Sequence, residues 1–171
     1  MKIGTKELTL CAVLAALALG LSYIESFFPA VLLLPLPGVK LGLANIVTVF
    51  ALYALGGGYA LAILLVRVLL GAMFAGNASA LLFSLLGGLS ALAVMLALRR
   101  IGALSVFGVS IGGAAAHNCG QVGAAMLTLG SKAPLAYLPA LLGTSVLTGA
   151  VTGLIASLLF RALHRTQLIK P

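Results

Sequence analysis

Residues 80–98 read ALLFSLLGGLSALAVMLAL, an apolar run without a charged side chain that ends at Arg99 and Arg100. As a helix this run would be about 28 Å long, which is close to the thickness of the hydrocarbon core of a bilayer. Basic residues gather on the cytoplasmic side of membrane helices, so the two arginines mark that end. The stretch predicts a transmembrane helix.

The rest of the chain repeats this pattern. The sequence is 63% hydrophobic and only 7% charged, whereas soluble domains carry about 25% charged residues. Such a chain cannot cover a water-facing surface, which excludes a soluble enzyme. We predict an all-α fold in which residues 1–171 form one integral membrane bundle of six transmembrane helices. The predicted spans are 8–28, 41–55, 59–75, 80–98, 106–129 and 136–160.

Two connections between the predicted spans have distinct compositions. Gly56, Gly57 and Gly58 separate the second and third spans, and glycine suits a tight turn. Residues 29–37 contain three prolines around an apolar stretch. Proline resists continued helix, so this segment is expected to be a loop or half-helix at the membrane surface or folded back over the bundle.

The basic residues predict the orientation of the chain in the cell membrane. Most of the basic residues lie on the side that holds both termini, whereas the opposite side carries Lys40 and Lys132, and Arg67 falls inside a span. We therefore expect both termini in the cytoplasm. The net charge of +8 sits at the ends of apolar runs, a pattern that does not favour nucleic acid as a partner. The basic residues on the side of the termini are Lys2, Lys6, Arg99, Arg100, Arg161, Arg165 and Lys170.

Small residues recur at every fourth position in three spans, which places them on one helical face where another helix can approach closely. In the fifth and sixth spans this pattern favours packing inside the bundle. In the first span it fits either packing or docking of a partner protein. The three sets are Ala12, Ala16 and Gly20; Gly108, Gly112, Ala116, Gly120 and Ala124; and Ser145, Gly149, Gly153 and Ser157.

Polar side chains enter the predicted spans between the midplane and the outer surface, while the cytoplasmic half is nearly free of them. Polar groups in lipid are costly and usually face the interior of a bundle. One outward-facing, positively charged cavity for an anionic or carbonyl-bearing ligand explains this clustering. Its candidate residues are Glu25, Lys40, Asn45, Arg67, Asn77, His117, Asn118 and Gln121.

Each candidate also has a structural interpretation. Arg67 can pair with Glu25 or cap backbone carbonyls, and Lys40 can extend its amine to the membrane surface. His117 can be a hydrogen-bonded core residue, because no second His, Cys or carboxylate stands beside it at metal-ligand spacing. Asn45 and Gln121 can form hydrogen bonds between helices.

The residue inventory restricts the chemistry. Glu7 and Glu25 are the only acidic residues, so the chain has no aspartate for a magnesium site. It also lacks the G-x-x-x-x-G-K-[ST] loop that cradles phosphates. Cys11 and Cys119 form no metal-binding spacing and are expected to be buried, inert thiols. We predict no catalytic residue, cofactor or metal site.

Two motifs carry a resemblance to a known family. Residues 37–48, PGVKLGLANIVT, resemble the signature of a bacterial membrane family called Gx transporters, also named heptaprenyl diphosphate synthase component I. Residues 117–121, HNCGQ, look like its second signature. That family is similar to the S components of energy-coupling factor transporters, six-helix proteins that bind vitamins. The resemblance covers nearly the whole chain.

The resemblance implies a substrate-binding subunit for a small vitamin-like solute, gated by the loop at 29–37. Ala12 and Ala16 match the face by which S components dock on a coupling protein driven by ATPases. The family's other name implies instead a non-catalytic membrane subunit of isoprenoid or quinone synthesis. A third possibility is a role in flavin-based extracellular electron transfer. The candidate ligands are thus a vitamin-like solute, a flavin or a prenyl compound.

Overall fold

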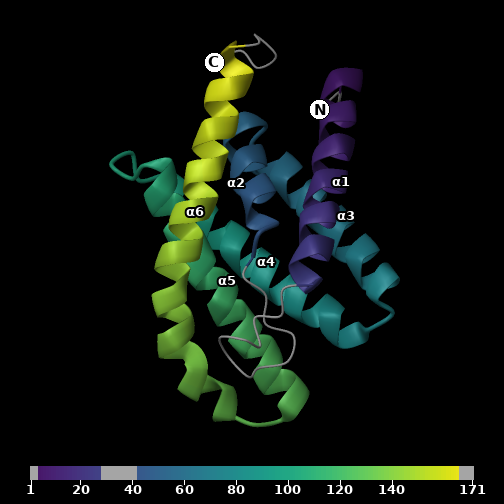
Figure 1. Ribbon diagram of the computed structural model, residues 1–171, viewed down its shortest axis with the longest axis vertical. Coiled ribbons are helices and arrows are strands. Elements are labelled where there is room, and N and C mark those ends of the chain that lie inside the picture. The colour runs from purple at the N-terminus through teal and green to yellow at the C-terminus, as the bar shows by residue number, and fades with distance from the viewer. Residues whose placement is uncertain (1–3, 28–41, 166–171) are drawn as a thin grey trace.

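The computed structural model describes residues 4–27 and 42–165. Within these ranges every regular element is helical, which confirms the all-α class (Figure 1). The predicted loop at 29–37 and Lys40 lie outside the described residues. The elements are α1 (Thr5–Phe27), α2 (Asn45–Ala54), α3 (Gly57–Ala75), α4 (Ala78–Arg99), α5 (Val106–Leu129), the 3-10 helix η2 (Ala133–Tyr137) and α6 (Leu138–Arg165).

Four of the described helices, α1, α3, α4 and α6, are long and apolar enough to cross a membrane. The other two α-helices, α2 and α5, are also predicted to cross the membrane but do not meet this criterion of length and apolar character. α2 has 10 residues and is therefore about 15 Å long, half the hydrocarbon thickness. α5 has 24 residues, but the polar run from His117 to Gln121 lowers its mean hydropathy. The structure thus supports a membrane bundle with four evident spans.

The shortest α-helix lies at the centre of the fold. α2 contacts all five other α-helices, and every residue from Asn45 to Leu52 is buried. Its apolar side chains form the main core with residues of α3 and α4, including Leu64 and Met95. Protein therefore surrounds most of α2, while Tyr53 and Ala54 at its C-terminal end are partly exposed.

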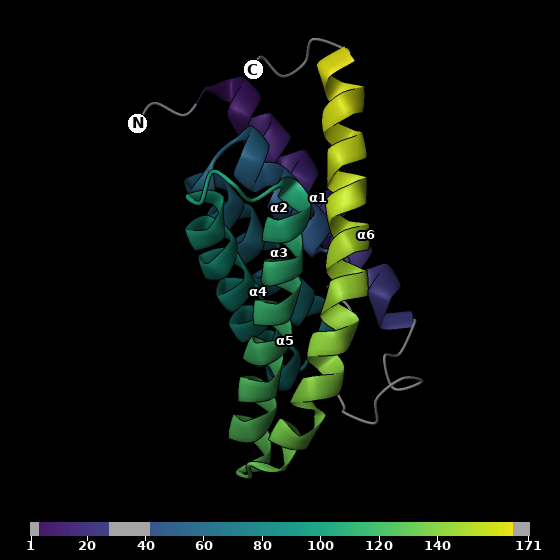
Figure 2. The same ribbon diagram turned by 90° about the vertical axis from the view of Figure 1, so that its left-hand side faces the viewer.

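The longer helices pack around α2 in an asymmetric way. α5 and α6 form an antiparallel hairpin that reaches furthest from the chain termini, and α4 packs along α5 (Figure 2). α1 packs on α2 and α3. The start of α1, the end of α6 and the α4–α5 connection lie towards the same end of the bundle (Figure 2).

Glycines make the tight connections and the close helix contacts. Gly56 has a φ of 98° between α2 and α3, which confirms the predicted glycine turn. A Cβ atom on Gly120 of α5 would lie 2.4 Å from the carbonyl oxygen of Leu86 in α4. One on Gly149 of α6 would lie 2.5 Å from the Cα of Ile111. Packing inside the bundle is therefore confirmed for these glycines.

Two expectations about α1 and α5 have different outcomes. Ala12, Ala16 and Gly20 are exposed on α1, so this stripe is not covered by another described helix. The prediction that both cysteines are buried is wrong for Cys119, which is exposed, while Cys11 is partly buried. Cys119 faces outwards because the neighbouring residues Asn118 and Gly120 point towards α6 and α4.

Candidate functional site

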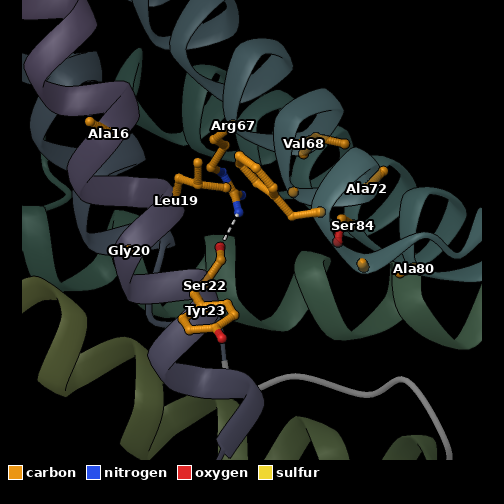
Figure 3. A pocket seen from close by; sticks show the side chains of 13 residues that line it. Ala16, Leu19, Gly20, Ser22, Tyr23, Arg67, Val68, Ala72, Ala80 and Ser84 are labelled. Carbon is orange, nitrogen blue, oxygen red and sulfur yellow. Dashed lines mark hydrogen bonds between the residues drawn. The ribbon is translucent and has the colours of Figure 1, made fainter.

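A cavity of about 670 Å³ lies between α1, α3 and α4. Figure 3 shows Arg67 reaching from α3 towards Ser22 on α1, with Ser84 and Ala80 of α4 on the far wall. Of the predicted ligand-binding residues, Arg67 lines this cavity. The lining residues are Ala16, Leu19, Gly20, Ser22, Tyr23, Arg67, Val68, Gly71, Ala72, Phe74, Ala75, Ala80 and Ser84.

Arg67 is the charged group of the cavity wall. Its side chain is only 6% exposed, although it lies in the middle of a helix long enough to span a membrane. Nη1 donates a hydrogen bond to the hydroxyl of Ser22 over 3.2 Å. Nε and Nη2 are buried and have no hydrogen-bond partner among the described residues. Two nitrogens of this guanidinium are therefore available for a ligand.

Glu25 stabilises the positive charge of Arg67 electrostatically and also contacts the backbone ahead of α2. Its carboxylate is buried and accepts hydrogen bonds from the backbone N–H groups of Gly42 and Leu43. These groups precede α2, whose N-terminus carries the positive end of the helix dipole. Glu25 thus ties the end of α1 to the start of α2.

Asn45, His117 and Gln121 form a buried polar layer around two glycines. Gly42 has a φ of 85°, and a Cβ atom built on it would lie 2.9 Å from Nδ2 of Asn45 and 3.6 Å from the His117 ring. A Cβ on Gly87 of α4 would lie 2.9 Å from the His117 ring and 3.1 Å from Gln121. The glycines therefore let α2, α4 and α5 meet at these side chains.

Two other predicted candidates form hydrogen bonds within the helical scaffold. The Asn118 amide donates to the carbonyl oxygen of Leu141 and the hydroxyl of Ser145, both over 2.9 Å, which joins α5 to α6. Asn77 is exposed and caps α4, because its side chain accepts the N–H of Ser79 over 2.8 Å. Neither residue lines the cavity.

Comparison with known proteins gives one match. The family model described as heptaprenyl diphosphate synthase component I matches residues 14–159. The chain belongs to the heptaprenyl diphosphate synthase component I family. No curated protein and no solved structure matches. The matched region contains all six α-helices in whole or in part.

In this component I chain, sequence reasoning missed the residues that shape the cavity around Arg67. Ser22, Tyr23 and Ser84 are ordinary residues in apolar helices, so their types give no signal. The pair Gly87-Gly88 gives one, because glycine inside a membrane helix marks close packing. A Cβ on Gly88 would lie 3.5 Å from Nη2 of Arg67.

The groups around the cavity suit contact with an acceptor-bearing molecule. Among the described residues, no three His, Cys, Asp or Glu side chains gather in a way that could hold a metal ion. A guanidinium with free donors suits recognition of a carboxylate, phosphate or carbonyl oxygen, because its planar fork matches two acceptors at once. The surrounding wall is mostly aliphatic or glycine.

Proposed function

We propose that this chain is a membrane ligand-binding subunit of transport type that holds an anionic or carbonyl-bearing molecule at Arg67. One observation carries the proposal. Arg67 is buried, two of its nitrogens lack partners among the described residues, and it borders an open cavity of about 670 Å³. Pockets of about 300–1,000 Å³ are typical of small-molecule sites.

The physical argument rests on the cost of burying a charge. A guanidinium away from water is stable only when its donors are satisfied and its charge is compensated. Ser22 satisfies one donor, and Glu25 compensates part of the charge. A ligand with two acceptor oxygens would satisfy Nε and Nη2 together, as in bidentate arginine pairs. Glu25 would then orient Arg67 without neutralising its positive charge completely.

The proposed transport function is also supported by the positions of the polar groups. The end of α1 that bears Glu25 and the start of α2 that bears Asn45 both point away from the chain termini (Figure 1). With the termini in the cytoplasm, these groups and His117 and Gln121 would lie in the outer half of the membrane.

Release on the inner side would need a partner. The exposed residues Ala12, Ala16 and Gly20 would dock a coupling protein driven by ATPases, as the resemblance to S components implies. Ala16 and Gly20 also line the cavity. Docking on this face of α1 would therefore reshape one cavity wall and weaken the hold on the ligand.

A second function is favoured by the family name. A component I of heptaprenyl diphosphate synthase would be a non-catalytic membrane subunit that works with the other component of that enzyme. A positively charged site in an apolar cavity could hold a diphosphate with its prenyl chain. In that case the ligand would be a reactant or product of a cytosolic partner and would not be transported.

Mass spectrometry of the molecules released from the purified chain distinguishes these functions. The chain is purified in a mild detergent and denatured, beside Arg67→Gln and the matched control Asn118→Leu. The proposal predicts a stoichiometric anionic or carbonyl compound from wild type and Asn118→Leu, and none from folded Arg67→Gln. A prenyl diphosphate would favour the synthase role. The same compound from Arg67→Gln would contradict both.

A further inference from the structure

The wall of the cavity is chemically divided. Arg67, Ser22, Tyr23 and Ser84 supply its polar groups, and none of the described residues that line it is acidic. The remaining nine lining residues are aliphatic, phenylalanine or glycine. Figure 3 shows the Arg67–Ser22 pair between α1 and α3, with Val68, Ala72 and Ala80 along the other wall. A ligand here meets a single charged anchor and a long apolar surface.

The cavity lies between two helices whose backbones stay apart. α1 contacts α2 and α3, but no described residue of α1 has its Cα atom within 8 Å of a Cα atom in α4, α5 or α6. Both α1 and α4 nevertheless contribute to the lining, so the cavity fills the gap between them. Phe74 and Tyr23 stand at its border and are 76% and 63% exposed. In a membrane these exposed aromatic side chains would meet lipid.

We infer that the ligand is an amphiphilic anion that enters from the bilayer, with its acidic oxygens on Arg67 and its apolar tail along α3 and α4. This inference rests on the proposed function and narrows it to a class of ligand. A solute with many hydroxyl or amide groups would lose hydrogen bonds to water against this wall and find few replacements. An alkyl or prenyl tail would lose none.

The tail would concentrate the ligand in the bilayer from which it enters. Each methylene group transferred from water to an apolar environment favours this partition by roughly fourfold, whereas a purely polar anion stays in water. The head would distinguish the cavity from the surrounding lipid, because only the cavity offers a guanidinium. Both parts of the ligand are therefore needed for preferential occupation of this site.

Fluorescence quenching can measure that preference directly. The chain contains no tryptophan, so Phe74→Trp places a unique reporter at the cavity border. Leu147→Trp places the control on α6, where Leu147 is 71% exposed and outside the cavity lining. Both proteins are reconstituted in phosphatidylcholine nanodiscs and titrated with dodecyl phosphate that carries bromine on its terminal carbon.

The head and tail are then varied one at a time. The inference predicts that the brominated phosphate quenches Phe74→Trp at a concentration at least tenfold lower than Leu147→Trp. Brominated dodecanol should quench the two reporters alike. Inorganic phosphate in hundredfold excess should not displace the amphiphile. Displacement by inorganic phosphate would overturn the inference that the ligand needs an apolar tail, but it would still support an anion site at Arg67.

Two substitutions test the assigned contacts in the Phe74→Trp background. Arg67→Gln should remove the tenfold preference, and retained preference would overturn both this inference and the proposed function. Ala80→Phe keeps Arg67 but fills the apolar wall, and should also remove the preference. Ala140→Phe on the exposed face of α6 is its matched control and should change nothing. Equal behaviour of Ala80→Phe and Ala140→Phe would overturn the placement of the tail.

A final titration identifies the source of the amphiphile. The Phe74→Trp protein is reconstituted with phosphatidylglycerol as a tenth of the lipid, and the brominated phosphate is added again. A loss of quenching supports a resident anionic membrane lipid as the ligand. Unchanged quenching supports a single-chain amphiphile that the bilayer lipid cannot replace. Absence of preferential quenching in both lipid compositions would overturn the inference.

Discussion

The carboxylate of Glu25 in α1 accepts the backbone N–H of Leu43 over 3.2 Å, just before α2 begins. At the other end of α2, Nη1 of Arg99 in α4 donates to the carbonyl oxygen of Leu52. A negative group at the N-terminus and a positive group at the C-terminus both compensate the dipole of a helix. The central helix, too short to cross the membrane, is thus fixed at both ends by side chains of opposite charge.

Removal of the first of these groups should loosen the start of α2. Glu25→Ala leaves two backbone N–H groups without their charged acceptor, which should cost about 2 kcal/mol of unfolding free energy. The measurement is unfolding of the purified protein by a denaturing detergent, followed by circular dichroism. Glu7→Ala is the control, because Glu7 is exposed in the first turn of α1. Equal stability of the two variants would contradict this role of Glu25.

Arg99 should stabilise the other end of α2 in a way that its neighbour does not. Its guanidinium also lies over the Tyr53 ring, 5.0 Å from the centroid. Arg99→Ala should lose about 1–2 kcal/mol of unfolding free energy, and Arg100→Ala should lose much less. Thermal unfolding of both variants provides the comparison. A larger effect of Arg100→Ala would show that charge at this end of the bundle matters more than contact with α2.

The close approach of α4 and α5 should depend on one glycine. Gly120→Ala places a methyl group against the Leu86 carbonyl, and such overpacking should cost about 1–3 kcal/mol. Gly123→Ala on the same helix is the control, since no atom lies within 4 Å of the added Cβ. Melting temperatures of the two variants test this, and a loss in Gly123→Ala as large as in Gly120→Ala would refute it.

Asn118 should matter for stability and not for ligand binding. Its amide is used by Leu141 and Ser145 of α6, and an interhelical hydrogen bond in a membrane is worth about 1 kcal/mol. Asn118→Leu should therefore melt at a lower temperature but retain the wild-type ligand content measured by mass spectrometry. Loss of ligand with unchanged melting would place Asn118 in the binding site.

The sequence predicts the long, regular helices well. The run at 106–129 matches α5 residue for residue, and the glycine turn before α3 is where the composition places it. The predicted span that contains α2 is longer than the helix, because the residues at 42–44 continue the apolar run and lie before the helix begins at Asn45. The carboxylate of Glu25 takes that position at the helix start, and a tertiary contact of this kind leaves no local pattern.

The polar cluster shows the same limit at the level of single residues. His117 and Asn118 are adjacent and equally polar, but each residue turns an α-helix by about 100°. His117 therefore faces Gly42 and Gly87, while Asn118 faces α6. The sequence shows that both residues fall inside one apolar span, but it does not show which helix each of them faces. The gap between α1 and α4 that creates the cavity is likewise a property of packing.

The central claim is that the free donors of Arg67 hold the ligand. Its most direct test is thermal unfolding of ligand-stripped wild type and Arg67→Gln, each with and without the molecules released from wild type by denaturation. A ligand that binds the folded state raises the melting temperature. We expect a rise for wild type and none for folded Arg67→Gln. An equal rise in both proteins would contradict the assignment of Arg67 as the anchor of the site.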